Sequence, residues 1–136
     1  MHGILLFAHG ARNPAWADPF RAIARHMQQC APQHPVALAF LELMPPDLGT
    51  AAAALIDQGC TELTVVPLFL GAGGHILNDL PVLVTQLQQA HPQVTVRATA
   101  TIGQTDAIIR AIAETALQLV GQPAEPAPLA QAPSHS

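Results

Sequence analysis

The sequence contains no lysine and no tyrosine, and it carries little charge of either sign. Its 136 residues include five basic and nine acidic side chains, which gives a formal net charge of −4 at pH 7. The basic residues are all arginines, at positions 12, 21, 25, 97 and 110. This balance excludes the broad basic surface that holds nucleic acids or anionic membranes. An anionic ligand would need a particular arginine or the N-terminus of a helix.

Cysteine is also scarce, and long apolar runs are missing. Cys30 and Cys60 are isolated, so they form neither a CxxC pair nor zinc-finger spacing. Two such thiols are more typical of reduced cysteines than of a disulfide. No stretch approaches the roughly 20 apolar residues that cross a bilayer. The first apolar run, Ile4–Ala8, is too short for a signal peptide. We therefore expect a cytoplasmic protein.

Half of the residues are apolar, and the length suits one domain with one hydrophobic core. Near Gln122 the composition changes to proline, alanine and serine, which cannot build a core. The sequence therefore predicts a folded domain over residues 1–120 and a disordered Pro/Ala-rich tail over residues 121–136.

Strand-like and helix-like segments alternate along the chain. Short apolar runs predict four strands, over residues 4–8, 36–43, 63–70 and 94–98. Apolar residues at helical spacing predict four helices: one from an Asp18 cap to before Pro32, one between Asp47 and Gly59 caps, and two over about 79–90 and 105–119.

This alternation predicts an α/β fold with a single open, mostly parallel four-stranded sheet and helices on both faces. Each helix is expected to turn an apolar face toward the sheet. For the last helix, that core face comprises Ile109, Ile112, Ala113 and Ala116.

Polar residues follow three of the predicted strands at the edge where open parallel sheets bind ligands. His9, Arg12 and Asn13 follow the first strand, Glu42 ends the second, and Gly73, Gly74 and His75 follow the third. We expect these residues to converge on one rim of the sheet.

Each of these residues also has a purely structural interpretation. A histidine after a strand can cap a helix, and Glu42 and Arg12 could form a salt bridge with each other. His75 favours function, because its neighbouring glycines let the backbone approach a ligand. We assign structural roles to the other histidines, to Asp47 and to Trp16; the histidines concerned are 2, 26, 34 and 91.

Two histidines and one carboxylate make an incomplete metal shell. Imidazole binds cobalt, nickel, iron and zinc well, whereas magnesium and calcium prefer oxygen ligands. A structural zinc site would be closed by four ligands. An open set suits an ion that is to be passed on.

These motifs resemble those of the small CbiX-type sirohydrochlorin chelatases. Residues 5–14, LLFAHGARNP, resemble the first strand and loop of that family, and residues 40–42 with Pro45 resemble the end of its second strand. Residues 66–81, which include VPLFLGAGGH, resemble its most specific motif. The resemblance covers about residues 3–120. One departure is Ala11, where the family commonly has serine.

The resemblance implies an ATP-independent lyase that inserts cobalt, nickel or iron(II) into sirohydrochlorin or a related tetrapyrrole, in cobalamin- or sirohaem-type biosynthesis and without a nucleotide. His9 and His75 would be catalytic metal ligands, and Glu42 would orient a histidine or accept a proton. The residues that would bind the tetrapyrrole are Arg12, Asn13, Gly73 and Gly74. Because long relatives hold two such domains, this half-unit is expected to act as a homodimer.

Two other functions stay open. His9-Gly10 after the first strand is similar to the start of histidine phosphatases, but those have an arginine where this chain has Ala8. The domain could also be a metal or tetrapyrrole carrier without turnover, to which the Ala11 departure gives weight. Hydrolysis of a phosphomonoester would support the first function, and binding without insertion would support the second.

Overall fold

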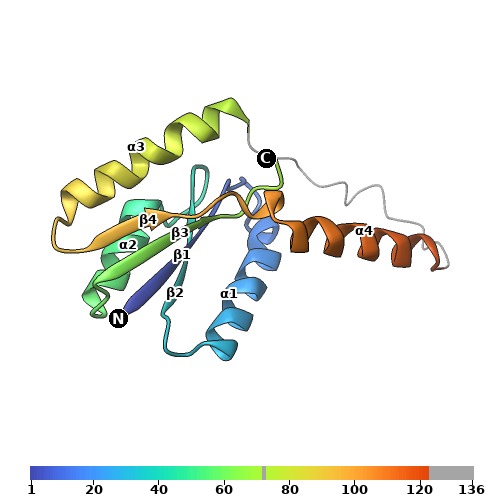
Figure 1. Ribbon diagram of the computed structural model, residues 1–136, viewed down its shortest axis with the longest axis horizontal. Coiled ribbons are helices and arrows are strands. Elements are labelled where there is room, and N and C mark those ends of the chain that lie inside the picture. The colour runs from blue at the N-terminus through green and yellow to red at the C-terminus, as the bar shows by residue number, and fades with distance from the viewer. Residues whose placement is uncertain (72, 123–136) are drawn as a thin grey trace.

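One open, all-parallel sheet organises the chain. The computed structural model describes residues 1–71 and 73–122, with the backbone alone for residues 74–77. The strands are β1 (His2–Ala8), β2 (Val36–Phe40), β3 (Glu62–Pro67) and β4 (Thr95–Ala98). They lie in the order β2-β1-β3-β4, and all neighbours are parallel (Figure 1). The predicted α/β fold is therefore confirmed; most of the predicted tail lies outside the described residues.

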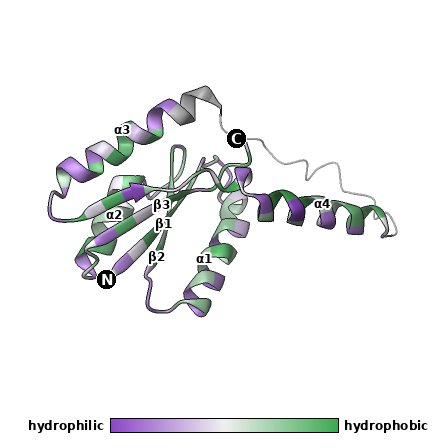
Figure 2. Ribbon diagram, viewed as in Figure 1, coloured by the Kyte–Doolittle hydropathy of each residue, from purple (hydrophilic) through white to green (hydrophobic). Residues whose placement is uncertain are grey.

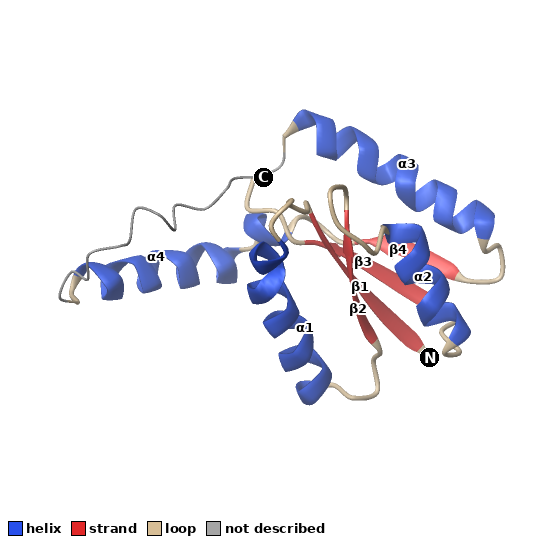
Figure 3. Ribbon diagram, turned by 180° about the vertical axis from the view of Figure 1, so that it is seen from behind, coloured by secondary structure: helices blue, strands red, loops and turns tan. Residues whose placement is uncertain are grey.

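Helices cover both faces of this sheet. The described helices are α1 (Asp18–Cys30), α2 (Leu48–Asp57), α3 (Gly74–Ala90) and α4 (Asp106–Val120), with two short 3₁₀ helices, η1 (Pro14–Ala17) and η2 (Ile102–Gln104). The connections β1–β2 and β2–β3 run in opposite directions across the sheet. Because such crossovers are right-handed, α1 lies on one face, and α2 and α3 lie on the other (Figure 3).

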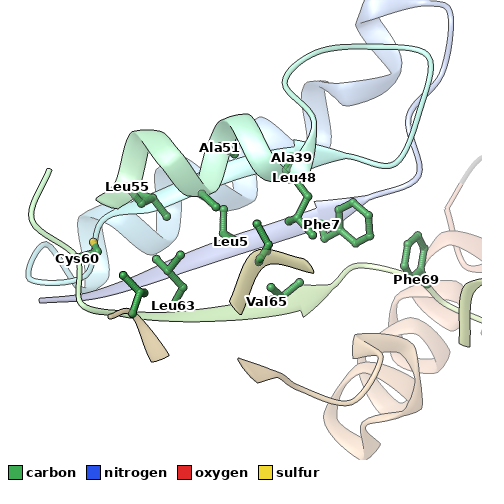
Figure 4. Close-up of a cluster of buried hydrophobic side chains, with 13 residues drawn as sticks. Leu5, Phe7, Ala39, Leu48, Ala51, Leu55, Cys60, Leu63, Val65 and Phe69 are labelled. Carbon is green, nitrogen blue, oxygen red and sulfur yellow. The ribbon is translucent and has the colours of Figure 1, made fainter. Parts of the chain in front are cut away.

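The larger core cluster lies between the sheet and helices α2 and α3. Leu5 and Val65 are paired in the β1–β3 register and are fully buried on this face, next to Leu63 and to Leu55 of α2 (Figure 4). Burial also raises the pKa of the Cys60 thiol, so this side chain stays protonated and apolar.

A smaller cluster forms on the face of α1. Ala8, Ala17 and Phe40 are its buried members. The ring of Trp16 lies 4.7 Å from that of Phe20, between centroids, and both pack against this cluster. The assignment of Trp16 to packing is thus confirmed.

Two of the predicted caps are confirmed, and one is wrong. The Asp47 carboxylate accepts a hydrogen bond from the Thr50 amide at 2.8 Å, which lowers the pKa of Asp47 and starts α2. Gly59 follows this helix with a φ of +106°. Asp18, however, is the first residue of α1 and not its cap; its carboxylate pairs with Arg21 at 3.2 Å.

Two observed element boundaries near the rim differ from the predicted ones. The second strand ends at Phe40, because the chain reverses at Leu43, whose φ is +69°. Helix α3 begins at Gly74, about five residues before the predicted start. The glycine run resembles a loop and Pro81 resembles a helix start, yet Pro81 lies inside the helix.

The predicted core face of α4 is wrong. Every residue of this helix except Ile108 is exposed, and Ile109 and Ile112 are 53% and 49% exposed. The helix projects away from the sheet instead of packing on it (Figures 1 and 3). Helices α1 to α3 each connect two strands, whereas no strand follows α4 within the described residues. No helix within the described ranges is long and apolar enough to span a bilayer.

Replacing Leu63 by alanine should lower the free energy of unfolding by about 2–5 kcal/mol, since the side chain is fully buried and leaves a cavity. The same change at Leu70, which is 69% exposed, should alter it by less than about 0.5 kcal/mol. Chemical denaturation checks both values. Equal effects of the two variants would contradict the assigned core.

Candidate functional site

His9 and Glu42 meet at the carboxyl edge of the sheet. His9 directly follows β1, and Glu42 lies two residues after β2. The imidazole Nε2 of His9 lies 3.1 Å from Oε1 of Glu42. Their side chains are 36% and 55% exposed, so the pair faces solvent and a ligand could reach it. Two of the residues expected on this rim are therefore side by side.

Backbone pairing beyond the ends of the strands sets this contact. The Leu41 amide donates to the Ala8 carbonyl at 2.9 Å, and the Glu42 amide donates to the His9 carbonyl at 3.1 Å. Gly10 adopts a φ of +98°, and a Cβ there would lie 1.9 Å from the Glu42 carbonyl oxygen. Only glycine fits this crossing, so residue 10 holds the Glu42 loop against the end of β1.

The contact also defines the hydrogen-bonding state of His9. A carboxylate can only accept a hydrogen bond, so Nε2 of His9 carries the proton. In the neutral ring, Nδ1 then holds a free lone pair. This is the arrangement of a metal-binding histidine whose second nitrogen is held by a carboxylate.

Arg12 and Asn13 lie in the loop that follows His9. Arg12 is exposed, and its guanidinium has no ion-pair partner in the part of the chain that is described. The considered salt bridge between Arg12 and Glu42 is thus not formed. The Asn13 side chain accepts a hydrogen bond from the Ala15 amide at 3.0 Å and caps η1. Asn13 therefore has a structural role whatever else it binds.

The glycine-rich segment leads into α3. Gly73 is the N-cap residue, and Gly74 and His75 are the first two residues of the helix. His75 thus lies in a helical turn and not in the expected loop. The N-cap residue, a glycine, offers no side-chain acceptor to the first amides of this helix. The His75 side chain and Ala72 lie outside the description, so the role of His75 stays a prediction.

Among the other described histidines, the two near the N-terminal end of β1 have structural partners, as predicted. Nε2 of His2 lies 2.7 Å from the Thr64 hydroxyl, and Nδ1 of His34 lies 3.0 Å from the His2 carbonyl. His91 is the C-cap residue of α3, and His26 lies on α1. The described residues contain no group of three or more histidine, cysteine or acidic side chains that could hold a metal ion.

Two features near this rim have no signature in the sequence. The first is the need for glycine at position 10, because the crossing with Glu42 depends on chain reversal at Leu43. An apolar cavity of about 470 Å³ lies between α3 and the segment after β4. Its walls come from two segments, residues 80–85 and 98–104, and no local sequence pattern reports the space between them.

Comparison with known proteins places these features in a family context. The CbiX family profile matches residues 3–119. The sirohydrochlorin cobaltochelatase of Methanothermobacter thermautotrophicus is 35% identical over 79 residues, which are 58% of this chain and 54% of that protein. That of Saccharolobus islandicus is 33% identical over 84 residues, 62% of this chain and 64% of that protein. The chain thus spans less than two thirds of these relatives.

Solved structures share the fold. A protein from Marinobacter aquaeolei, described as CbiX of cobalamin (vitamin B12) biosynthesis, superposes with a TM-score of 0.80 and 32% identity, covering 89% of this chain and 98% of that one. SirB from Bacillus subtilis with Fe³⁺ superposes with a TM-score of 0.75 and 26% identity, covering 93% of this chain and 50% of that one. SirB therefore contains a second stretch of similar length.

Gly10→Ala should move the Glu42 loop, because the new methyl group would clash with a backbone carbonyl and the positive φ is strained. We expect a loss of at least about 2 kcal/mol in unfolding free energy and a changed ¹⁵N shift of His9 Nε2. Gly59→Ala is the matched control: its φ is +106°, but nothing lies within 4 Å of the added Cβ. It should cost about 1 kcal/mol and leave the His9 signal in place. An unmoved His9 signal in Gly10→Ala would disprove the crossing.

Proposed function

The chain belongs to the CbiX family, and we propose that it inserts a divalent metal ion into sirohydrochlorin or a related tetrapyrrole. The observation that carries this proposal is the exposed His9–Glu42 pair at the carboxyl rim. Its imidazole has one nitrogen held by a carboxylate and the other available to a metal. The names of the cobaltochelatase relatives support the same reaction.

In this proposal the ion is a substrate that His9 holds briefly through Nδ1. Glu42 accepts the Nε2 hydrogen bond, which fixes the ring and increases its donor strength. His75, from the first turn of α3, is proposed as the second ligand. A shell of two imidazoles leaves coordination positions open, so the nitrogens of the macrocycle can replace the protein ligands one after another.

Insertion also requires bases. The incoming divalent ion replaces two pyrrole N–H protons, so two protons must leave the ring for each ion inserted. The Glu42 carboxylate can accept one of them. When the ion leaves His9, the free Nδ1 lone pair can accept the other. Each proton can then pass to water, because both side chains are partly exposed.

Carboxylates on the tetrapyrrole would be held by groups beside this pair. Arg12 is exposed and without an ion-pair partner in the described ranges, so its guanidinium is available for a bidentate contact. Gly73 and Gly74 stand at the N-terminus of α3, where backbone amides can bind an anion. Asn13 can contribute its amide nitrogen, since its oxygen is used by the Ala15 amide.

The proposal also covers the metal ion, the oligomeric state and the cellular compartment. Imidazole and carboxylate donors suit Co²⁺, Ni²⁺ and Fe²⁺, and selection then depends on supply and geometry. We propose a homodimer, because SirB is covered to 50% by this chain. We propose a cytoplasmic setting, because Cys30 and Cys60 are both free thiols, as expected under reducing conditions.

His9→Ala and His75→Ala should each reduce insertion of Co²⁺ into sirohydrochlorin by at least about 100-fold in kcat/KM, because a metal ligand is lost. Glu42→Gln should reduce it about 10–100-fold, since an outer hydrogen-bond partner is weakened. His91→Ala is the control and should keep the wild-type rate. Anaerobic absorbance assays measure the rates, and circular dichroism checks the fold.

Wild-type rates in both His9→Ala and His75→Ala would contradict the proposed ligands. If the wild-type protein shifts the spectrum of the macrocycle but does not speed insertion, it is a carrier and not a chelatase.

A further inference from the structure

Two leucines at the carboxyl rim expose large apolar side chains next to the candidate site. Leu43 directly follows Glu42 and is 48% exposed, and Leu70 lies three residues after the end of β3 and is 69% exposed. Because β2 and β3 are the two neighbours of β1, the segments that follow them lie on either side of His9. Both segments lie at the same end of the sheet (Figure 1), and Figure 2 shows the segment after β3 in the green of hydrophobic residues. His9 thus has an exposed leucine in the loop on each side.

The hydrophobic core does not account for these two side chains. Their chain neighbours are in the core: Met44 packs against the smaller cluster, and Phe69 is a buried member of the larger one. Leu43 and Leu70 belong to neither cluster of the described residues. Small-molecule sites combine apolar walls with a few polar groups that fix the orientation of the ligand. The two leucines and the His9–Glu42 pair form such a combination.

The backbone of Leu43 gives a second reason to look for a use of its side chain. Its φ of +69° is in the left-handed region, which is unfavourable for a residue that carries a Cβ. The turn itself serves the site, because it brings Glu42 to His9. Glycine or asparagine would make the same turn more easily. Since strained residues persist mainly where function uses them, we attribute the leucine to its exposed side chain and not to the turn.

We propose that Leu43 and Leu70 hold one face of the tetrapyrrole macrocycle over the His9–Glu42 pair. A conjugated macrocycle has two apolar faces and carries its carboxylates on the edge. A face that packs on apolar side chains leaves water, which favours binding. The edge carboxylates suit a guanidinium, and Arg12 is exposed in the loop after His9. This inference rests on the proposed function and names the residues that orient its organic substrate.

This orientation fits the transfer of an ion from His9. A metal ion enters a macrocycle through one face, because the ring nitrogens point toward the centre and the edge is closed by carbon atoms. A face held by a leucine on each side of His9 presents those nitrogens to an ion on Nδ1 of the histidine. Such placement removes much of the entropic cost of the transfer step. Leu43 and Leu70 are therefore binding residues, and they act neither as metal ligands nor as bases.

The first test is the affinity for the macrocycle without metal. Metal-free sirohydrochlorin is titrated anaerobically with the protein, and the absorbance of the macrocycle is followed. Leu43→Gly and Leu70→Ala should each raise Kd about 10-fold, because each removes one apolar contact. Ile23→Ala is the matched control: Ile23 is 42% exposed but lies on α1, so its loss should leave Kd unchanged. Wild-type Kd values in both leucine variants would overturn the proposal.

Stability separates this role from a structural one. Leu43→Gly removes the side chain and the backbone strain together, so its denaturation midpoint should stay at the wild-type value or rise. A structural leucine would instead lose stability with its side chain. In the insertion assay, both leucine variants should raise KM and change kcat much less, whereas His9→Ala lowers kcat. An unchanged KM with a lowered kcat in the leucine variants would contradict a binding role.

The second test shows whether the contact is apolar. Leu70→Met keeps an apolar side chain and should keep the wild-type Kd. Leu43→Asn keeps the size and tolerates the left-handed turn but is polar, so it should bind as weakly as Leu43→Gly. The loss in the leucine variants should persist at high salt, whereas the loss in Arg12→Ala should shrink because charges are screened. A leucine effect that disappears at high salt would exclude an apolar contact.

These measurements separate the inference from the proposed function. If the wild type binds the macrocycle but inserts no metal, the proposed function fails, and the Kd values of the variants still decide the role of the leucines. If the wild type inserts metal and both leucine variants bind as it does, the function stands and this inference falls. Wild-type Kd values together with a changed mass in solution would assign the leucines to a contact between protein chains. No binding by the wild type would overturn both.

Discussion

The crossing of two backbone segments at Gly10 is the constraint on which the candidate site depends. The β1–β2 pairing continues for two residues past the strands, through amides of Leu41 and Glu42 that donate to carbonyls of Ala8 and His9. Gly10 leaves the room for this approach. Hydrogen bonds between main-chain atoms thus fix the imidazole and the carboxylate relative to each other, although both side chains are partly exposed. The exposed His9–Glu42 pair therefore has a defined geometry.

Much of this arrangement could be predicted from the sequence. The alternation of strands and helices predicts the parallel sheet. The rule that ligands bind beyond its carboxyl edge predicts that His9 and Glu42 lie close together, and the structure has them in contact. Local signals were reliable where one residue suffices, as with the Asp47 cap. They failed at the start of α3: the glycine run indicated a loop and Pro81 a helix start, yet the helix already includes Gly74 and His75.

Helix α4 shows the limit of periodicity as a guide. Its pattern correctly indicates an apolar face, but a pattern does not say which chain supplies the surface that covers it. The other three helices each connect two strands of the sheet. No strand follows α4 within the described residues, and Ile109 and Ile112 remain about half exposed.

The most direct measurement is the rate of metal insertion by the wild-type protein. Sirohydrochlorin is mixed anaerobically with the protein, Co²⁺, Ni²⁺ or Fe²⁺ is added separately, and the absorbance of the macrocycle is followed against a control without protein. The account predicts faster conversion with at least one of these metals. Conversion at the control rate with all three metals would contradict the account, and the His9–Glu42 pair would then have a function other than metal insertion.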